Sequence, residues 1–138
     1  MKLIIFEGLD GSGKTTLIQK VRKKGHELIT LQGLGSSSID QPLRDIFLTN
    51  SQLKPLTRYI LSFANLVQIQ EEIIKIYLNT NKIILIDRWL GYNFAYQTYP
   101  HNIDKNYQFF NLLNKQFIKP ALLRFFRQIL SLKLFFKT

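Results

Sequence analysis

The feature that most constrains this chain is the run over residues 8–15, which has the spacing G-x-x-x-x-G-K-[ST] of a phosphate-binding P-loop. An apolar run over residues 3–6 precedes it, and residues 15–21 after it have helical character. In this context the loop N–H groups and the helix N-terminus both face an anion. The alternative is a glycine-rich turn that only precedes a helix. Because Lys14 and Thr15 both stand at the positions that the P-loop spacing requires, we favour a nucleoside triphosphate site.

The residue types in the loop suit this chemistry. Glycines let the backbone turn with its N–H groups inward. Lys14 would reach the outer phosphates, and the Thr15 hydroxyl would ligate Mg²⁺. The loop therefore predicts a bound triphosphate and its magnesium ion.

Length and composition limit the remaining possibilities. A chain of 138 residues with 46% apolar and 20% charged side chains predicts one globular domain with a core. The absence of cysteine excludes disulfides and thiolate metal sites. No apolar run reaches the length of a membrane span, and an apolar strand begins almost at the first residue. We therefore expect no signal peptide, no membrane partner and a cytoplasmic location.

The net charge of +10 is unevenly distributed. Residues 1–104 hold twelve basic and all nine acidic side chains, whereas residues 105–138 hold seven basic side chains and no acidic one. A nucleic-acid or acidic-lipid surface is one interpretation, and a solvated basic face or atypical tail is another. Because the basic residues are interspersed with Phe and Leu, we favour the second and do not expect nucleic acid as a partner.

Strands alternate with helices along the chain. Apolar patterns and turn formers predict strands over 2–7, 27–31 and 82–87, a loop over 32–38, and helices over 14–24, 40–49 (with Asp40 as a cap), 55–78 and 107–118. This order predicts an α/β fold with a parallel sheet flanked by helices. Ligands of such folds lie at the carboxyl ends of the strands. The P-loop, the 32–38 loop and residues 87–88 should therefore meet at one edge.

Asp87 and Arg88 follow the buried strand at that edge. A carboxylate beside a P-loop can hold Mg²⁺ directly or through water. An adjacent guanidinium can bind a second phosphate group with two parallel hydrogen bonds. The alternative is an ordinary Asp–Arg ion pair that closes a strand.

Residues 6–16 have the sequence FEGLDGSGKTT, and residues 87–97 have the sequence DRWLGYNFAYQ. The pair of motifs resembles the thymidylate kinase family, in which F-E-G-x-D-G-x-G-K-[ST]-T is followed by D-R-[YFW]-x-x-S-x-x-A-Y-Q. The resemblance extends from about residue 2 to Pro120 and is looser over residues 39–44 and 63–64. It implies a P-loop fold of the nucleoside monophosphate kinase type.

The resemblance also implies an activity and a site. The reaction would be transfer of the γ-phosphoryl group of ATP to dTMP, giving dTDP and ADP for dTTP biosynthesis, with ATP and Mg²⁺ as cofactors. Asp10, Lys14 and Arg88 would be catalytic, and Thr15 and Asp87 would hold the metal. The ATP-binding residues would be Gly8, Gly11, Ser12, Gly13, Lys14, Thr15 and Thr16. The dTMP-binding residues would be Asp10, Arg44, Phe63 (stacked on thymine), Arg88 (on the phosphate), Asn93, Tyr96 and Gln97.

The resemblance further implies small-molecule nucleotides as partners and a homodimer, for which the helix over 55–78 offers a face. Two single residues and one triplet depart from the family pattern. Tyr92 stands where the family has Ser, Val67 where it has Arg, and residues 32–34 (QGL) where it has R-E-P. These departures keep a deoxynucleoside kinase or another nucleoside monophosphate kinase open as alternatives.

The C-terminal part departs furthest from the family. After Pro120 we find no Arg-rich lid, and Ser12 means that the P-loop itself carries no Arg. We therefore expect an incomplete kinase domain over 1–126 and a basic apolar tail over 127–138. A truncated ATP-binding remnant with little catalysis is the alternative function. For the tail itself, a frameshift near Pro120 and an amphipathic helix for a membrane or partner are competing hypotheses.

Overall fold

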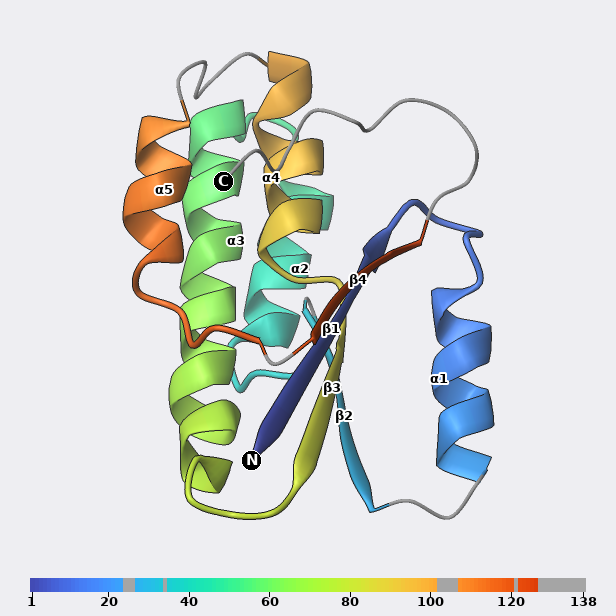
Figure 1. Cartoon of the computed structure of the whole chain (residues 1–138). Coiled ribbons are helices and arrows are strands. Elements are labelled where there is room, and N and C mark those ends of the chain that lie inside the picture. The colour runs from blue at the N-terminus through green and yellow to red at the C-terminus, as the bar shows by residue number, and fades with distance from the viewer. Residues whose placement is uncertain (24–26, 34, 102–106, 121, 127–138) are drawn as a thin grey trace.

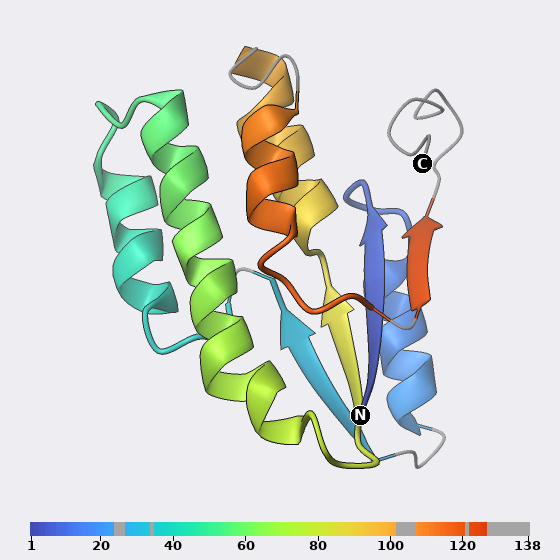
Figure 2. The same cartoon turned by 60° about the vertical axis from the view of Figure 1, so that its left-hand side comes forward.

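A parallel sheet forms the centre of the computed structural model, which describes residues 1–23, 27–33, 35–101, 107–120 and 122–126 (Figure 1). Its strands are β1 (Lys2–Gly8), β2 (Leu28–Gln32), β3 (Ile83–Asp87) and β4 (Leu122–Phe126). They lie in the order β2-β3-β1-β4 with every pair parallel (Figure 2). The predicted α/β class and the three predicted strands are confirmed.

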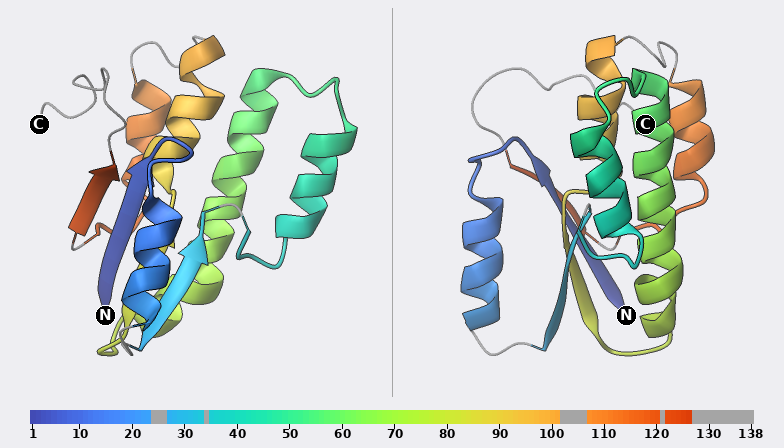
Figure 3. Two further views of the ribbon diagram at one scale, coloured as in Figure 1. Left: turned by 90° about the vertical axis from the view of Figure 1, so that its right-hand side faces the viewer. Right: turned by 180° about the vertical axis from the view of Figure 1, so that it is seen from behind.

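Helices cover both faces of this sheet (Figure 3). On one face lies α1 (Lys14–Lys23). The other face carries α3 (Pro55–Ile69), α4 (Leu90–Gln97) and α5 (Gln108–Asn114), and α2 (Asp40–Thr49) lies beside α3. A 3₁₀ turn over Tyr99–His101 follows α4.

The strands bury side chains on both faces, as expected of a covered parallel sheet. In β1, Leu3 and Ile5 face the large cluster beneath α3 and α4, while Phe6 packs with Ile18 of α1 and Leu85 of β3. Ile84 and Ile86 of β3 belong to the large cluster. This two-sided burial holds the strand ends rigidly at the carboxyl edge.

The helix predicted over 55–78 is not continuous. After α3, the chain forms a π-helical turn over Gln70–Ile74 and a 3₁₀ turn over Lys75–Tyr77. The reason is Gln70, whose buried side chain donates a hydrogen bond to the Gln116 carbonyl and accepts one from the Ile118 N–H. The wider turn brings this amide inward, as such turns often do where a helix has a special contact. Three apolar positions of the predicted helical pattern are exposed instead of buried: Ile60, Val67 and Ile76.

Other boundaries also differ from the sequence prediction. Ile39, not Asp40, occupies the N-cap of α2, and Asp40 lies in the first turn without a side-chain cap bond. The helix predicted over 107–118 is shorter, because Tyr107 adopts a left-handed backbone (φ 55°) and Gln70 draws residues 116–118 out of the helix. Helix α4 has no counterpart in the sequence prediction.

None of the helices in the described part of the chain combines the length and apolar character that a membrane crossing needs. The predicted tail over 127–138 lies outside the described residues.

Candidate functional site

Three loops meet at the carboxyl edge of the sheet, as the sequence predicts. Asp87 at the end of β3 is in register with Phe6 of β1 on one side and with Gln32 of β2 on the other. The P-loop leaves β1 two residues after Phe6, and the 32–38 loop begins at Gln32. The sheet therefore brings together segments separated by tens of residues in sequence.

The P-loop backbone depends on glycine at two turns. Gly11 (φ 75°) and Gly13 (φ 89°) have left-handed conformations that other residues adopt only at a cost. The Leu17 N–H donates to the Gly13 carbonyl at 3.0 Å, which starts the hydrogen bonds of α1. The loop therefore wraps around the N-terminus of a ten-residue helix, the arrangement that favours an anion.

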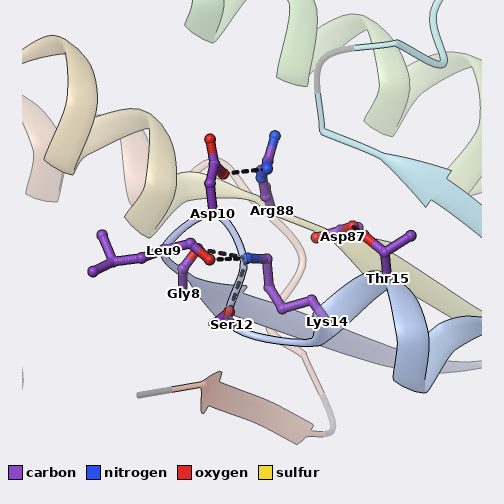
Figure 4. Close-up of polar contacts among 8 residues, drawn as sticks. All are labelled: Gly8, Leu9, Asp10, Ser12, Lys14, Thr15, Asp87 and Arg88. Carbon is purple, nitrogen blue, oxygen red and sulfur yellow. Dashed lines mark hydrogen bonds and ion pairs between the residues drawn. The ribbon is translucent and has the colours of Figure 1, made fainter. Parts of the chain in front are cut away.

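Lys14 lies inside this loop, as Figure 4 shows. Its Nζ donates to the carbonyl oxygens of Gly8 (2.7 Å) and Leu9 (2.6 Å) and to Ser12 Oγ (3.2 Å). Burial lowers the pKa of Lys14, and the nearby Asp87 carboxylate opposes that change. The loop thus holds one positive charge at the point where a phosphate would be cradled.

Thr15 and Asp87 form the second polar contact of the site (Figure 4). The Thr15 hydroxyl donates to Asp87 Oδ2 at 3.3 Å, and the buried Oδ1 has no hydrogen-bond partner among the described residues. A hydroxyl beside a carboxylate with a spare oxygen fits Mg²⁺, which usually takes one or two carboxylates and completes its shell with phosphate and water. Within the described ranges there is no cluster of three or more acidic or histidine ligands, so this pair is the candidate metal position.

Arg88 stands at the other side of the loop. Its guanidinium pairs with the Asp10 carboxylate and lies 4.6 Å from the centre of the Tyr92 ring. Its backbone is left-handed (φ 70°), and its N–H donates to the Phe6 carbonyl at 2.8 Å. Such strain persists only where the surroundings impose it. The turn after β3 is therefore built to aim Arg88 across the edge of the sheet.

A pocket lies next to Arg88 and is lined by Gln32, Gly33, Leu66, Arg88, Trp89, Tyr92 and Asn93. Three of these residues have a buried nitrogen without a partner in the part of the chain that the structure describes: Arg88 Nε, Trp89 Nε1 and Asn93 Nδ2. All three atoms are donors. Since a buried donor without an acceptor is costly, these three atoms mark hydrogen-bonding capacity beside the pocket that the described residues leave unused.

The structure brings most of the predicted residues together. Asp10, Lys14, Thr15, Asp87 and Arg88 surround the P-loop, as described above. Asn93 lines the pocket, and its Oδ1 accepts a hydrogen bond from Ser62 Oγ at 2.5 Å. The Tyr96 ring stacks on Tyr92 at 4.2 Å, and Gln97 ends α4.

Of the predicted dTMP-binding residues, Arg88 and Asn93 line the pocket, and the other five do not: Asp10, Arg44, Phe63, Tyr96 and Gln97. Phe63, expected to stack on a base, is only 3% exposed and packs in the core against Tyr59 and Phe117. Leu66, one turn further along α3, lines the pocket in its place. Arg44 is exposed on α2 and is not among the pocket-lining residues.

The sequence prediction assigned no role to Glu7, although its acidic side chain inside an apolar strand was a visible signal. Its buried carboxylate accepts hydrogen bonds from the start of α4. Burial raises the pKa of Glu7 to about 7, against the opposing effect of these bonds. The roles of Trp89 and Leu66 in the pocket carried no local sequence signal, because apolar side chains at these spacings are typical of a core.

Comparison with known proteins identifies a family for this chain. The thymidylate kinase family model matches residues 6–132, which extends beyond the limit near Pro120 expected from the sequence. The thymidylate kinase of Prosthecochloris aestuarii is 34% identical over 106 residues, covering 73% of this chain and 48% of that protein. The thymidylate kinase of Geotalea uraniireducens is 35% identical over 126 residues, covering 86% and 59%.

Among solved structures, the thymidylate kinase from Ehrlichia chaffeensis matches with a TM-score of 0.78 and 25% sequence identity. The match covers 91% of this chain and 74% of that one. The chain spans about half the length of the curated relatives it matches.

Proposed function

The chain belongs to the thymidylate kinase family, and we propose that it transfers the γ-phosphoryl group of ATP to dTMP, giving dTDP and ADP. One observation carries this proposal. Lys14 in the P-loop, the Thr15–Asp87 pair and Arg88 lie around one edge of the sheet, beside a pocket with unpartnered donors. In the proposed reaction the P-loop group would hold ATP, the phosphoryl donor, and the pocket beside Arg88 would hold dTMP, the phosphoryl acceptor.

In the proposed reaction, an oxygen of the dTMP phosphate attacks the γ-phosphorus, and the bond from that phosphorus to the β–γ bridging oxygen breaks. ADP leaves with the electron pair of that bond, so no covalent enzyme intermediate is required. The P-loop N–H groups and Lys14 hold the phosphates of ATP, from Gly8 through Thr16. Mg²⁺, when bound at Thr15 and Asp87, would neutralise charge on the phosphate oxygens. Catalysis then depends on alignment and charge stabilisation.

The acceptor would be held by the second half of the site. Arg88 would bind the dTMP phosphate, and Asp10, now paired with Arg88, would contact the sugar and orient the guanidinium. Asn93 would offer its buried Nδ2 to an oxygen of the base, with Tyr96 and Gln97 beside it on α4. Stacking by Phe63 would require its ring to leave the core, so we propose that Leu66, which lines the pocket, would contact the base of a bound nucleotide.

A different acceptor is the second candidate, and Tyr92 is the observation that favours it. Its ring lines the pocket where the family pattern has a small Ser, which narrows the space beside Arg88. Another nucleoside monophosphate would then replace dTMP. A further alternative is a nucleotide-binding protein with little turnover.

One assay distinguishes these functions. The purified chain is given ATP and Mg²⁺ with each nucleoside monophosphate in turn, and diphosphate products are separated and quantified. Turnover with dTMP alone supports the first proposal, and turnover with another monophosphate supports the second. Lys14→Ala should lower turnover by about 10²–10³. Lys20→Ala, which removes an exposed lysine of α1, is the matched control. ATP binding by calorimetry without turnover supports the weakly catalytic alternative, and absence of ATP binding refutes all three.

We also propose a homodimer formed through α3 and a cytoplasmic location, where ATP and nucleoside monophosphates are supplied. Four apolar residues of α3 are exposed at helical spacing and form one stripe: Leu56, Ile60, Ala64 and Val67. Ile60→Glu should convert a dimer to a monomer in light scattering, whereas Leu112→Glu on α5 should not. A monomeric wild type contradicts the dimer.

A further inference from the structure

Glu7 makes a contact that joins the two halves of the site. This residue precedes the P-loop in β1, and its side chain is buried, with 3% of its surface exposed. Its Oε1 accepts hydrogen bonds from the backbone N–H groups of Trp89 (3.1 Å) and Gly91 (2.9 Å). Its Oε2 accepts one from the N–H of Tyr92 (3.0 Å). One carboxylate thus satisfies three N–H groups at the start of α4.

These N–H groups are ones that a helix cannot satisfy by itself, because the first turn has no preceding carbonyls. A local side chain usually serves this purpose, yet Trp89 at the N-cap of α4 makes no side-chain cap bond. Glu7, which belongs to β1, takes the place of that local cap. When ionised, Glu7 also places a negative charge at the positive, N-terminal end of the helix dipole. The position of α4 is therefore tied to the end of β1.

The first turn of α4 passes very close to the Glu7 carboxylate at Gly91. A Cβ at this position would lie 3.3 Å from Glu7 Oε1, tighter than nearly all ordinary contacts of a side chain. The same turn carries two pocket residues, Tyr92 and Asn93. Asn93 has a second anchor in Ser62 of α3, whereas the bonds of Glu7 link this turn to the strand that bears the P-loop.

We propose that Glu7 is a positioning residue that holds the first turn of α4, and with it Tyr92 and Asn93, at a fixed place relative to the P-loop. Glu7 is not among the residues that line the pocket. Its three hydrogen bonds set the register between the ATP side and the acceptor side. The description of the pocket as the acceptor side rests on the proposed function.

The test compares Glu7→Ala and Glu7→Gln with the wild type. Glu27→Gln, an exposed carboxylate paired with Lys82 before β2, is the matched control. Hydrogen exchange of the backbone amides, followed by NMR, reports positioning without any catalysis. In Glu7→Ala the amides of Trp89, Gly91 and Tyr92 should exchange about tenfold faster or more, as expected on losing charge-assisted bonds. In Glu7→Gln, whose side chain keeps one acceptor oxygen, the Tyr92 amide alone should lose protection.

Kinetics then separates positioning from a general loss of structure. The KM for dTMP should rise about tenfold in Glu7→Ala, with the KM for ATP within about twofold of the wild type and partial recovery in Glu7→Gln. The proposal is overturned if the three amides are protected equally in Glu7→Gln and in Glu27→Gln. It is also overturned if the KM for dTMP and the KM for ATP rise equally in Glu7→Ala. If the wild type phosphorylates no monophosphate, the proposed function fails while the exchange experiment still decides the role of Glu7. If Glu7→Ala does not fold, the single-amide effect in Glu7→Gln decides it.

Discussion

Replacing Gly33 with alanine should distort the turn that carries Arg88. Gly33 follows β2 directly, and its N–H donates to the Asp87 carbonyl at 3.0 Å. A Cβ on this residue would overlap the Arg88 carbonyl oxygen and lie 2.9 Å from the carbonyl carbon. Both neighbours are backbone atoms, so neither can rotate away. The two chain segments must separate instead.

The structure sets the size of the effect. Overpacking of this kind costs about 1–3 kcal/mol, and weakening of the Gly33–Asp87 hydrogen bond adds about 1 kcal/mol, giving an expected loss of about 2–4 kcal/mol. For a chain of this size the melting temperature should fall by roughly 6–12 °C. Because Arg88 moves with the turn, affinity for dTMP should fall as well.

Urea unfolding followed by circular dichroism measures the loss directly. Gly11→Ala is the matched control: Gly11 also has a special backbone (φ 75°), but a Cβ there would meet nothing within 4 Å. That variant should lose only about 1 kcal/mol from backbone strain. If Gly33→Ala is no less stable than Gly11→Ala, β2 does not approach the Arg88 turn as described, and the reasoning is refuted.

Three further predictions concern single side chains of the site. Lys14→Ala should lower kcat/KM by about 10²–10³ with the fold intact, as for loss of one donor to transition-state charge, and a fall below tenfold in initial-rate assays would contradict its role. Tyr92→Ser should raise the KM for dTMP about threefold, because the ring faces the Arg88 guanidinium. Tyr92→Phe keeps that ring, so its KM for dTMP should match that of the wild type. If Tyr92→Phe raises this KM as much as Tyr92→Ser does, the hydroxyl has the role and the ring does not. Because folding raises the pKa of Glu7 to about 7, its contribution to stability is greatest below about pH 4.5 and is lost as the pH rises through 7. The free energy of unfolding of Glu7→Gln, measured with urea relative to the wild type, should therefore increase by as much as about 3 kcal/mol between pH 5 and 8. If the free energies of the two proteins change with pH in parallel, the Glu7 carboxyl does not titrate in this range.

The donor half of the site could be predicted from the sequence because its signals are local. The order of strand, glycine loop, Lys14 and Thr15 lies within a few residues, and each residue type has one function there. Asp87 was predictable for a similar reason, since a charge that ends a buried run lies at the carboxyl edge of a parallel sheet. The structure places Lys14 inside the loop and Asp87 at the carboxyl edge beside Thr15.

The acceptor half depends on contacts between distant segments, which a local pattern does not contain. Helix α4 has residues of modest helix propensity, such as Gly91 and Asn93, and is capped by Glu7 from β1. Phe63 fits a base-stacking position and a core position equally well by spacing, and packing against Phe117 decided between them. The π-helical turn likewise arises from the bonds of Gln70 to residues 116 and 118.

The sheet order also bears on how the chain acquires its site during synthesis. Among the strands of this sheet β1 is translated first, yet Lys2 pairs with Ile83 and Ile4 with Leu122. Until those later strands are made, both edges of an apolar strand remain unpaired, which exposes it to association with other chains. Pairings this distant in sequence also close slowly, because the loop entropy must be lost before the contacts form. The P-loop is therefore translated before the strands that give it a rigid support.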